Sequence, residues 1–108
     1  MLMDVHHYLT PQGVDLFQDW LDDLADLKGR IAVLRRIDRL ARGNFGDYQF
    51  IAAGVWELRI DCGPGYRVYF GRQGKDLVLL LCGGSKRTQA ADITDAVSYW
   101  ADYRRRTQ

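Results

Sequence analysis

The sequence predicts an α+β fold, in which a small antiparallel sheet is preceded and followed by helices. Apolar residues recur every three or four positions in residues 14–41 and 88–103, which is the period of amphipathic helices. Between residues 55 and 82 they alternate with polar residues or form short runs between glycine-rich turns, as in strands. A chain of 108 residues can bury one core, so we expect a single domain over residues 1–108.

The beginning of the chain is expected to form a strand and then a helix. Val5–Leu9 has the composition of a strand. Thr10 and Pro11 supply an N-cap and a first helical residue, so we expect the helix to begin there. Its apolar stripe consists of Val14, Phe17, Leu21 and Leu24.

A second helix is expected from Arg30 to about Arg42, between a break at Gly29 and a stop at Gly43. Its apolar positions are Ile31, Leu34, Ile37, Leu40 and Ala41. Because the connection between the two helices is short, we expect an antiparallel hairpin that covers one face of the sheet.

Three strands are expected next, joined by tight turns into an antiparallel meander. In Val55–Asp61, one face carries Trp56, Leu58 and Ile60, and the other carries Val55, Glu57, Arg59 and Asp61. After a Gly-Pro-Gly turn, Tyr66–Arg72 places Tyr66, Val68 and Phe70 on one face and Arg67 and Tyr69 on the other. Leu77–Cys82 is apolar at every position, which predicts a central strand covered on both faces.

A last helix is expected from about Thr88 to Tyr103, after Gly83, Gly84 and Ser85 end the third strand of the meander. Its stripe consists of Ile93, Ala96, Val97, Trp100 and Tyr103. We expect the basic residues that follow, Arg104–Arg106, to form a frayed and solvated tail.

Charge is distributed unevenly along the chain, although the net charge is only +1. The first 27 residues hold six aspartates, whereas all 15 Lys and Arg residues come later. This separation suits an anionic partner, and a solvated surface of mixed charge explains it equally well. With no signal peptide, no membrane-spanning run and two cysteines interpreted as reduced, we expect a cytoplasmic protein that does not bind membranes.

Several familiar catalytic patterns are absent from the sequence. It contains no HExxH, CxxC or GxSxG pattern and no glycine-rich phosphate loop before a helix. The only histidines, His6 and His7, are adjacent on a predicted strand and point to opposite faces. We therefore expect no metal site, no cofactor and no Ser-His-Asp triad.

The basic residues of the predicted sheet are the strongest candidates for a functional site. Arg59 and Arg67 are expected on one face with Glu57 and Tyr69, while Lys86 and Arg87 follow the last strand and precede a helix. Guanidinium groups, an ammonium group and a helix N-terminus together suit a phosphate. The alternative is that Arg59 pairs with Glu57 or Asp61 and that Lys86 and Arg87 are only solvated.

RNA cleavage is one chemistry that such a set can perform. A 2′-hydroxyl attacks the adjacent phosphorus, and guanidinium groups stabilise the charge that develops. The reaction also needs a general base and a general acid, for which Lys86, Tyr69, Tyr66 and Glu57 are the candidates. Tyr66 shares a face with core residues, so Tyr69 is the preferred tyrosine.

Two segments carry a family resemblance: GVWELRIDCGPGYRVYF at residues 54–70 and VLLLCGGSKRTQAADITDA at residues 78–96. Together with the GNFGD loop at residues 43–47, they resemble the addiction-module killer proteins. These proteins form the HigB-like branch of the RelE/ParE toxin superfamily. The resemblance implies a RelE-like small antiparallel sheet with an N-terminal helical hairpin and a C-terminal helix.

This resemblance implies the toxin of a type II toxin–antitoxin system, an endoribonuclease that cuts mRNA on the ribosome without a metal. The catalytic arginine of the family motif falls on Arg67, its later basic residues fall on Lys86 and Arg87, and Arg59 is the remaining RNA-binding candidate. The catalytic tyrosine of RelE falls on Ile93, which leaves the acid and base open, with Tyr69 as our candidate.

The alternative function is that of a ParE-like toxin, which inhibits DNA gyrase or another protein without cutting RNA. A third hypothesis is a degenerate toxin that survives as a partner of its antitoxin. The implied partners are a helix-turn-helix antitoxin from an adjacent gene, the ribosome with its mRNA, and DNA only through the toxin–antitoxin complex. We expect RNA on the sheet-and-loop side rather than on the acidic first helix.

Overall fold

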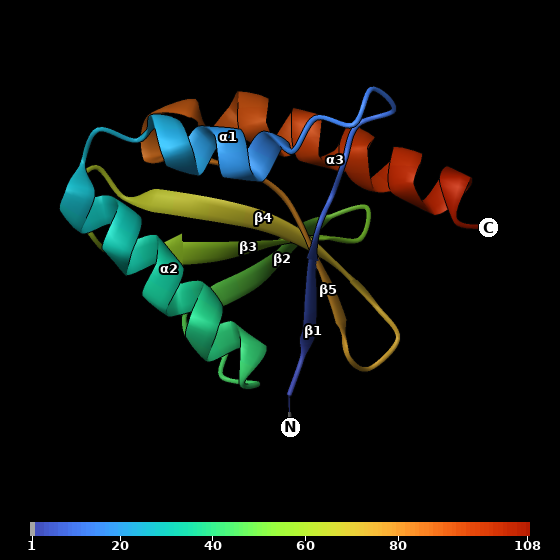
Figure 1. Ribbon diagram of the computed structural model, residues 1–108, viewed down its shortest axis with the longest axis horizontal. Coiled ribbons are helices and arrows are strands. Elements are labelled where there is room, and N and C mark those ends of the chain that lie inside the picture. Colours follow the sequence, from blue (N-terminus) through green and yellow to red (C-terminus); the bar gives the residue numbers. More distant parts are fainter. Residues whose placement is uncertain (1) are drawn as a thin grey trace.

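A computed structural model describes residues 2–108 as a five-stranded sheet packed between helices (Figure 1). The strands are β1 (Asp4–His7), β2 (Tyr48–Ala52), β3 (Val55–Ile60), β4 (Tyr66–Gln73) and β5 (Leu77–Ser85). The helices are α1 (Leu16–Asp23), α2 (Leu27–Ala41) and α3 (Gln89–Arg106), with a 3₁₀ turn, η1, at Lys86–Thr88. Within these described residues, no helix is long and apolar enough to cross a membrane. The α+β fold predicted from the sequence is confirmed.

The sheet has the strand order β1-β5-β4-β3-β2. Its centre is the predicted antiparallel meander of β3, β4 and β5. β1 joins β5 in parallel and makes β5 an internal strand. β2, which the sequence did not predict, forms the other edge beside β3. Its aromatic residues Tyr48 and Phe50 are 38% and 54% exposed, so β2 lacks the buried alternation that identifies a strand in a sequence.

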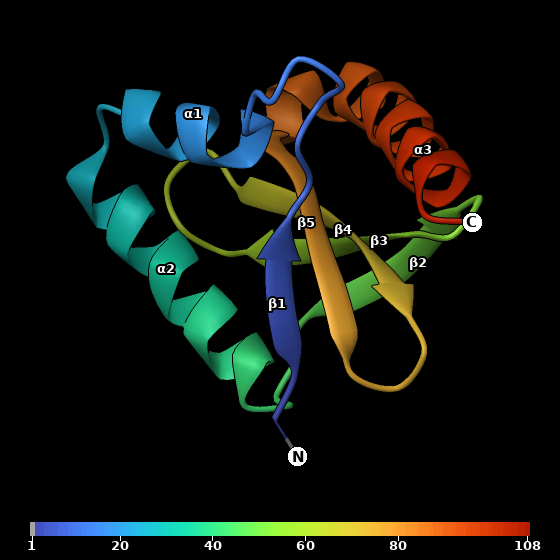
Figure 2. The ribbon, with the colours of Figure 1, turned by 45° about the vertical axis from the view of Figure 1, so that its right-hand side comes forward.

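Both faces of the sheet are covered, as predicted for the apolar strand β5. Figure 2 shows α1 and α2 on one side of the sheet and α3 on the other. The first core joins the two N-terminal helices to Leu58, Ile60, Tyr66, Val68, Phe70, Val78 and Leu80. The second joins α3, through Ala96 and Trp100, to Tyr8, Val55, Tyr69, Leu79, Leu81 and Cys82. The side of β3 and β4 that carries Glu57 and Tyr69 is therefore covered by α3.

The N-terminal helix starts later than predicted. Thr10 does not cap it, because its carbonyl and hydroxyl oxygens accept hydrogen bonds from the backbone N–H groups of Gly13 and Val14 instead. Gly13 has φ +84°, which closes this turn before the helix. Asp15 is the N-cap, since its carboxylate accepts from Gln18 N at 3.0 Å.

The second helix ends as predicted but faces the sheet differently. Gly43, at φ +91°, donates to Leu40 O, and Asn44 N donates to Arg39 O, which is a Schellman ending. Its buried residues are Gly29, Val33 and Leu40, whereas Ile31 and Leu34 of the predicted stripe are exposed. The short connection between α1 and α2 is present, and Figures 1 and 2 show the helices diverging from it.

The last strand and the last helix are both longer than predicted. A bulge opposite Tyr69 and Phe70 lets β5 continue through Gly83 and Gly84 to Ser85. Glycine at position 83 leaves room for the Trp20 ring, which a Cβ would overlap, and a Cβ at Gly84 would displace the Asp92 carboxylate.

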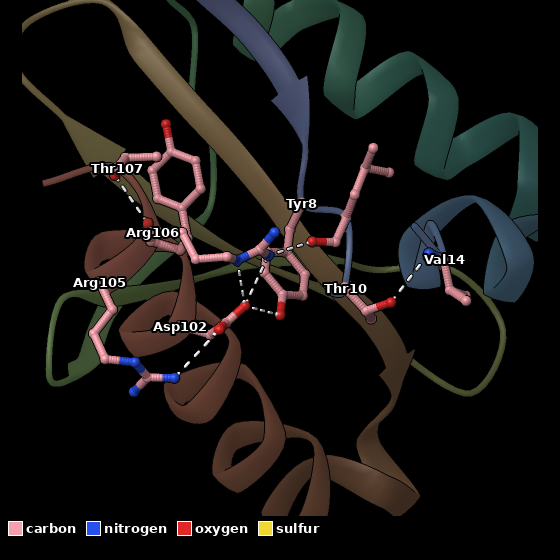
Figure 3. Close-up of polar contacts among 9 residues, drawn as sticks. Tyr8, Thr10, Val14, Asp102, Arg105, Arg106 and Thr107 are labelled. Carbon is pink, nitrogen blue, oxygen red and sulfur yellow. Dashed lines mark hydrogen bonds and ion pairs between the residues drawn. The ribbon is translucent and has the colours of Figure 1, made fainter. Parts of the chain in front are cut away.

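The C-terminal arginines are exposed, as predicted, but they belong to α3 and are not frayed, and two of them contact Asp102 (Figure 3). Asp102 accepts a hydrogen bond from the Tyr8 hydroxyl at 2.7 Å and pairs with Arg105 and Arg106. Arg106 also donates to Leu9 O and lies over the Tyr8 ring. Burial, followed by the bond to Asp102, raises the pKa of Tyr8 to about 12. These contacts fasten the end of α3 to the segment after β1.

Asp26 links the start of α2 to the start of β4. As the N-cap of α2 it accepts from Gly29 N at 3.1 Å, and it accepts from the Tyr66 hydroxyl at 2.7 Å. The bond from Tyr66, followed by that from Gly29, lowers the pKa of Asp26 below its usual 3.8. Burial, followed by the bond to Asp26, raises the pKa of Tyr66 to about 12. Tyr66 thus lies in the core, as the alternation predicted.

The lowered pKa of Asp26 predicts a contribution to acid unfolding. The unfolded chain binds this proton more tightly, so ionised Asp26 stabilises the fold above about pH 4. That stabilisation is lost as the pH falls through the folded pKa. Urea unfolding at about pH 6 and about pH 3 should show a smaller acid-induced loss of stability in Asp26→Asn than in wild type. Asp23→Asn, at an exposed position of α1, should behave as wild type; equal acid losses in all three proteins would refute the assignment.

Candidate nucleic-acid interface

A surface pocket of about 280 Å³ opens beside the turn between β3 and β4. Its lining residues are Asp47, Arg59, Ile60, Asp61, Gly65, Tyr66, Arg67 and Lys86. Three of the predicted site residues, Arg59, Arg67 and Lys86, therefore meet in one cavity, although they come from β3, β4 and the start of η1. Register explains the convergence, since Arg59 lies directly opposite Arg67 and Arg67 opposite Gly84.

Arg67 is fixed by the turn that precedes its strand. The turn closes through Gly65 N, which donates to Cys62 O at 3.0 Å. Arg67 Nη1 donates back to Gly65 O at 3.1 Å, and Lys86 N donates to the same carbonyl at 2.8 Å. Gly65 has φ +79°, a conformation that favours glycine. One carbonyl oxygen thus holds both an arginine side chain and the backbone that presents Lys86.

Glu57 holds Arg67 from the interior. Its side chain is fully buried, and Oε2 lies 3.4 Å from Arg67 Nε. Gln89, the first residue of α3, donates to the same oxygen at 2.9 Å. The Arg67 side chain is 12% exposed, so its outer edge still reaches the pocket. A buried carboxylate that loses its cation is strongly destabilising, which ties the orientation of Arg67 to the stability of the fold.

Arg59 is paired at the mouth of the pocket. Its Nη2 lies 3.2 Å from Asp47 Oδ1, and its backbone N donates to Asp47 O at 2.9 Å. Both side chains are substantially exposed, so the attraction between them is weak and solvent-screened. Lys86, in contrast, makes no ion pair with any residue in 2–108. The pocket therefore presents one unpaired cation and two guanidinium groups already in contact with carboxylates.

Two predicted site residues lie outside the pocket. Tyr69 is fully buried beneath α3, and burial, followed by the charge of Glu57, raises its pKa well above the usual value. This position argues against a catalytic Tyr69, because a hydroxyl covered by a helix cannot reach a substrate. The sequence analysis preferred Tyr69 because Tyr66 shares a face with core residues, and it did not predict that α3 covers Tyr69 on the other face. Arg87 is exposed on η1 next to Lys86 but does not line the cavity.

Asp47, Asp61 and Gln89 are the site residues that the sequence analysis did not assign. Asp47 reaches the pocket because β2 pairs with β3, and that pairing was not predicted. Asp61 was considered only as an ion-pair partner of Arg59, but it lines the pocket and forms no ion pair within residues 2–108. Within the same residues, no three His, Cys, Asp or Glu side chains are grouped as metal ligands.

Comparison with known proteins identifies relatives over most of the chain. A family model described as "Phage derived protein Gp49-like (DUF891)" matches residues 19–97. An "Uncharacterized protein" from Haemophilus influenzae is 50% identical over 80 residues, which is 74% of this chain and 81% of that protein. The matched range contains every residue that lines the pocket.

The Arg59–Asp47 pair predicts that removing the carboxylate strengthens anion binding. Asp47→Asn should bind a labelled single-stranded RNA oligonucleotide about two- to fivefold more tightly than wild type, because Arg59 becomes available to phosphate. Fluorescence anisotropy at low salt measures this. Asp23→Asn changes the net charge equally on exposed α1, so an equal gain there would show that Asp47 has no specific effect.

Proposed function

The chain belongs to the Gp49-like family of phage-derived proteins, and we propose that it is the toxin of a type II toxin–antitoxin system. In this proposal it is a RelE/ParE-related, HigB-like endoribonuclease that cuts mRNA on the ribosome. The observation that carries the proposal is the convergence of Arg59, Arg67 and Lys86 in one pocket. Two arginines from neighbouring strands and a lysine from the turn after β5 suit the backbone of a single-stranded nucleic acid.

In the proposed cleavage of RNA, Arg67 stabilises the transition state. The 2′-oxygen attacks phosphorus, the 5′-oxygen leaves, and the product is a 2′,3′-cyclic phosphate with a free 5′-hydroxyl. Negative charge gathers on the phosphoryl oxygens in the transition state, and a guanidinium group held in place stabilises it without having to reorient. Arg67 is held in this way by Glu57 and by Gly65 O.

The acid and the base of the proposed reaction come from the pocket lining. Asp61 is a carboxylate without an ion pair among the described residues, so it is the candidate that accepts the proton of the 2′-hydroxyl. Lys86 is the candidate that protonates the leaving 5′-oxygen. Tyr66 is less suited, since burial and Asp26 raise its pKa to about 12. Arg59 and Arg87 would bind flanking phosphates.

The proposed partners follow from this assignment. An antitoxin encoded by an adjacent gene would neutralise the protein, and a helix-turn-helix in that antitoxin would bring the complex to DNA. The ribosome would present unpaired mRNA to the pocket. Carboxylates neighbour two of the three cations, so the pocket alone attracts naked RNA weakly, which supports a need for presentation by the ribosome.

Substitution of Arg67 tests the proposal directly. Cleavage of a translated mRNA should fall by about 10²- to 10³-fold in Arg67→Lys, which retains a charge for Glu57 but loses the planar guanidinium group. Asp61→Asn should also lose cleavage, whereas Arg104→Lys, on the exposed side of α3, should not. Primer extension on mRNA with and without ribosomes maps the cuts.

The pattern of cuts separates the possible outcomes. Codon-phased cuts that require ribosomes and disappear in Arg67→Lys would support the nuclease. Growth arrest with intact mRNA and inhibited gyrase would overturn it in favour of a ParE-like toxin. Circular dichroism of each variant shows whether the fold is retained.

A further inference from the structure

The outer face of α2 carries an apolar stripe that no part of the described chain covers. Leu27, Ile31 and Leu34 are 64%, 42% and 52% exposed. They are spaced at i, i+4 and i+7, so they lie along one side of the helix. Figure 2 shows α2 at the edge of the molecule, with no other element on its outer side.

The exposure of this stripe follows from how α2 is seated. Gly29 packs against the Tyr66 ring, where a Cβ would overlap it, and Val33 and Leu40 lie in the core. Arg36, on the same side of the helix, donates to backbone carbonyls of residues 45, 47 and 59. With these residues facing the sheet, the opposite side of α2 must face outward.

Basic residues border the stripe. Lys28, Arg30, Arg35 and Arg39 lie on α2 and make no ion pair within residues 2–108. The helix has one acidic residue, Asp38, and Arg42 pairs with it at 2.6 Å. The surface therefore combines exposed aliphatic side chains with positive charge that the protein itself does not neutralise.

We propose that this face of α2 binds an amphipathic helix with acidic flanks, contributed by the antitoxin. An apolar row at helical spacing is what such a partner covers, and acidic flanks complement the unpaired cations. A nucleic acid would pair with the arginines but would leave Leu27, Ile31 and Leu34 without apolar contacts. The identity of the partner rests on the proposed function, whereas the location of the surface rests on the exposure and charge of α2.

Aspartate substitutions in the stripe test this surface. The probe is the purified product of the gene adjacent to that of this protein, titrated by calorimetry. Ile31→Asp and Leu34→Asp should each weaken binding at least about 30-fold, as expected at the centre of an interface. Val14→Asp is the matched control, because Val14 is 39% exposed in the loop before α1, and it should bind within about twofold of wild type.

Charge reversal tests the second feature of the surface. The double variant Lys28→Glu/Arg35→Glu should bind more weakly and with a smaller dependence on salt. Lys75→Glu/Arg104→Glu makes the same change in net charge at exposed positions elsewhere and should bind as wild type does. Thermal unfolding of every variant shows whether it is folded.

Several outcomes would overturn the inference. The inference is wrong if the folded stripe variants bind as wild type does. It is also wrong if wild type does not bind the adjacent gene product. If the chain alone dimerises and Ile31→Asp makes it monomeric, the stripe binds a second copy instead. If wild type binds vesicles with anionic lipid and Ile31→Asp does not, the stripe is a membrane contact.

Measuring mRNA cleavage beside binding separates this inference from the proposed nuclease. Ile31→Asp should cleave as wild type does, because it lies outside the pocket. Stripe-dependent binding without any cleavage by wild type would refute the nuclease and retain the surface. Cleavage with stripe-independent binding would refute the surface alone.

Discussion

The hydrogen bonds of the Arg36 side chain help to position both the pocket and the apolar stripe of α2. Its guanidinium group donates to the carbonyls of Phe45 at 2.9 Å and Asp47 at 3.2 Å, and also to that of Arg59. Burial lowers its pKa, but an arginine so placed remains a cation, and the carbonyl oxygens offset the loss of water. One side chain thereby joins a helix, a loop and a strand. The pocket forms where that loop and strand meet, and the apolar stripe lies on the far side of the same helix.

Two arginines of the pocket pair with carboxylates. These pairs fix the orientation of the guanidinium groups but weaken the electrostatic field of the pocket. Glu57 fixes Arg67 from inside the protein, and Asp47 holds Arg59 at the rim. Each pair partly cancels the charge that a distant phosphate would feel. In return, the guanidinium groups need little reorganisation when a phosphate arrives at contact distance. Such a site suits a substrate that another assembly delivers, rather than one captured from solution.

The sequence predicted the parts of the fold that depend on simple periodicity. Alternation in β3 and β4 correctly separated Tyr66, Val68 and Phe70 from Arg67. The apolar run Leu77–Cys82 of β5 is covered on both faces. The stripe of α3 was also correct, because only one side of that helix meets the sheet. The family resemblance pointed to Arg67 and Lys86, which do share a pocket.

What the sequence did not predict depends on tertiary contacts. α2 contains apolar residues on two sides, so the spacing of apolar residues alone could not show that Val33 faces the core and Ile31 faces outward. Its true orientation is set by Gly29, which fits against a ring, and by an arginine that faces inward. Tyr69 appeared accessible because alternation assigns a residue to a face but does not show that a helix covers that face. β2 went unpredicted because its residues are mostly exposed.

The parallel pairing of β1 with β5 also constrains when the chain can finish folding during its synthesis. Asp4 pairs with Leu77, so β1 leaves the ribosome about 70 residues before the strand with which it pairs. The end of α3 then fastens the segment after β1 through Tyr8 and Asp102. The nascent chain therefore cannot complete this sheet until β5 has been made. The backbone hydrogen bonds of α2 join only residues close in sequence, so this helix can begin to form before the strand that carries Arg67 has emerged, although its packing against that strand comes later.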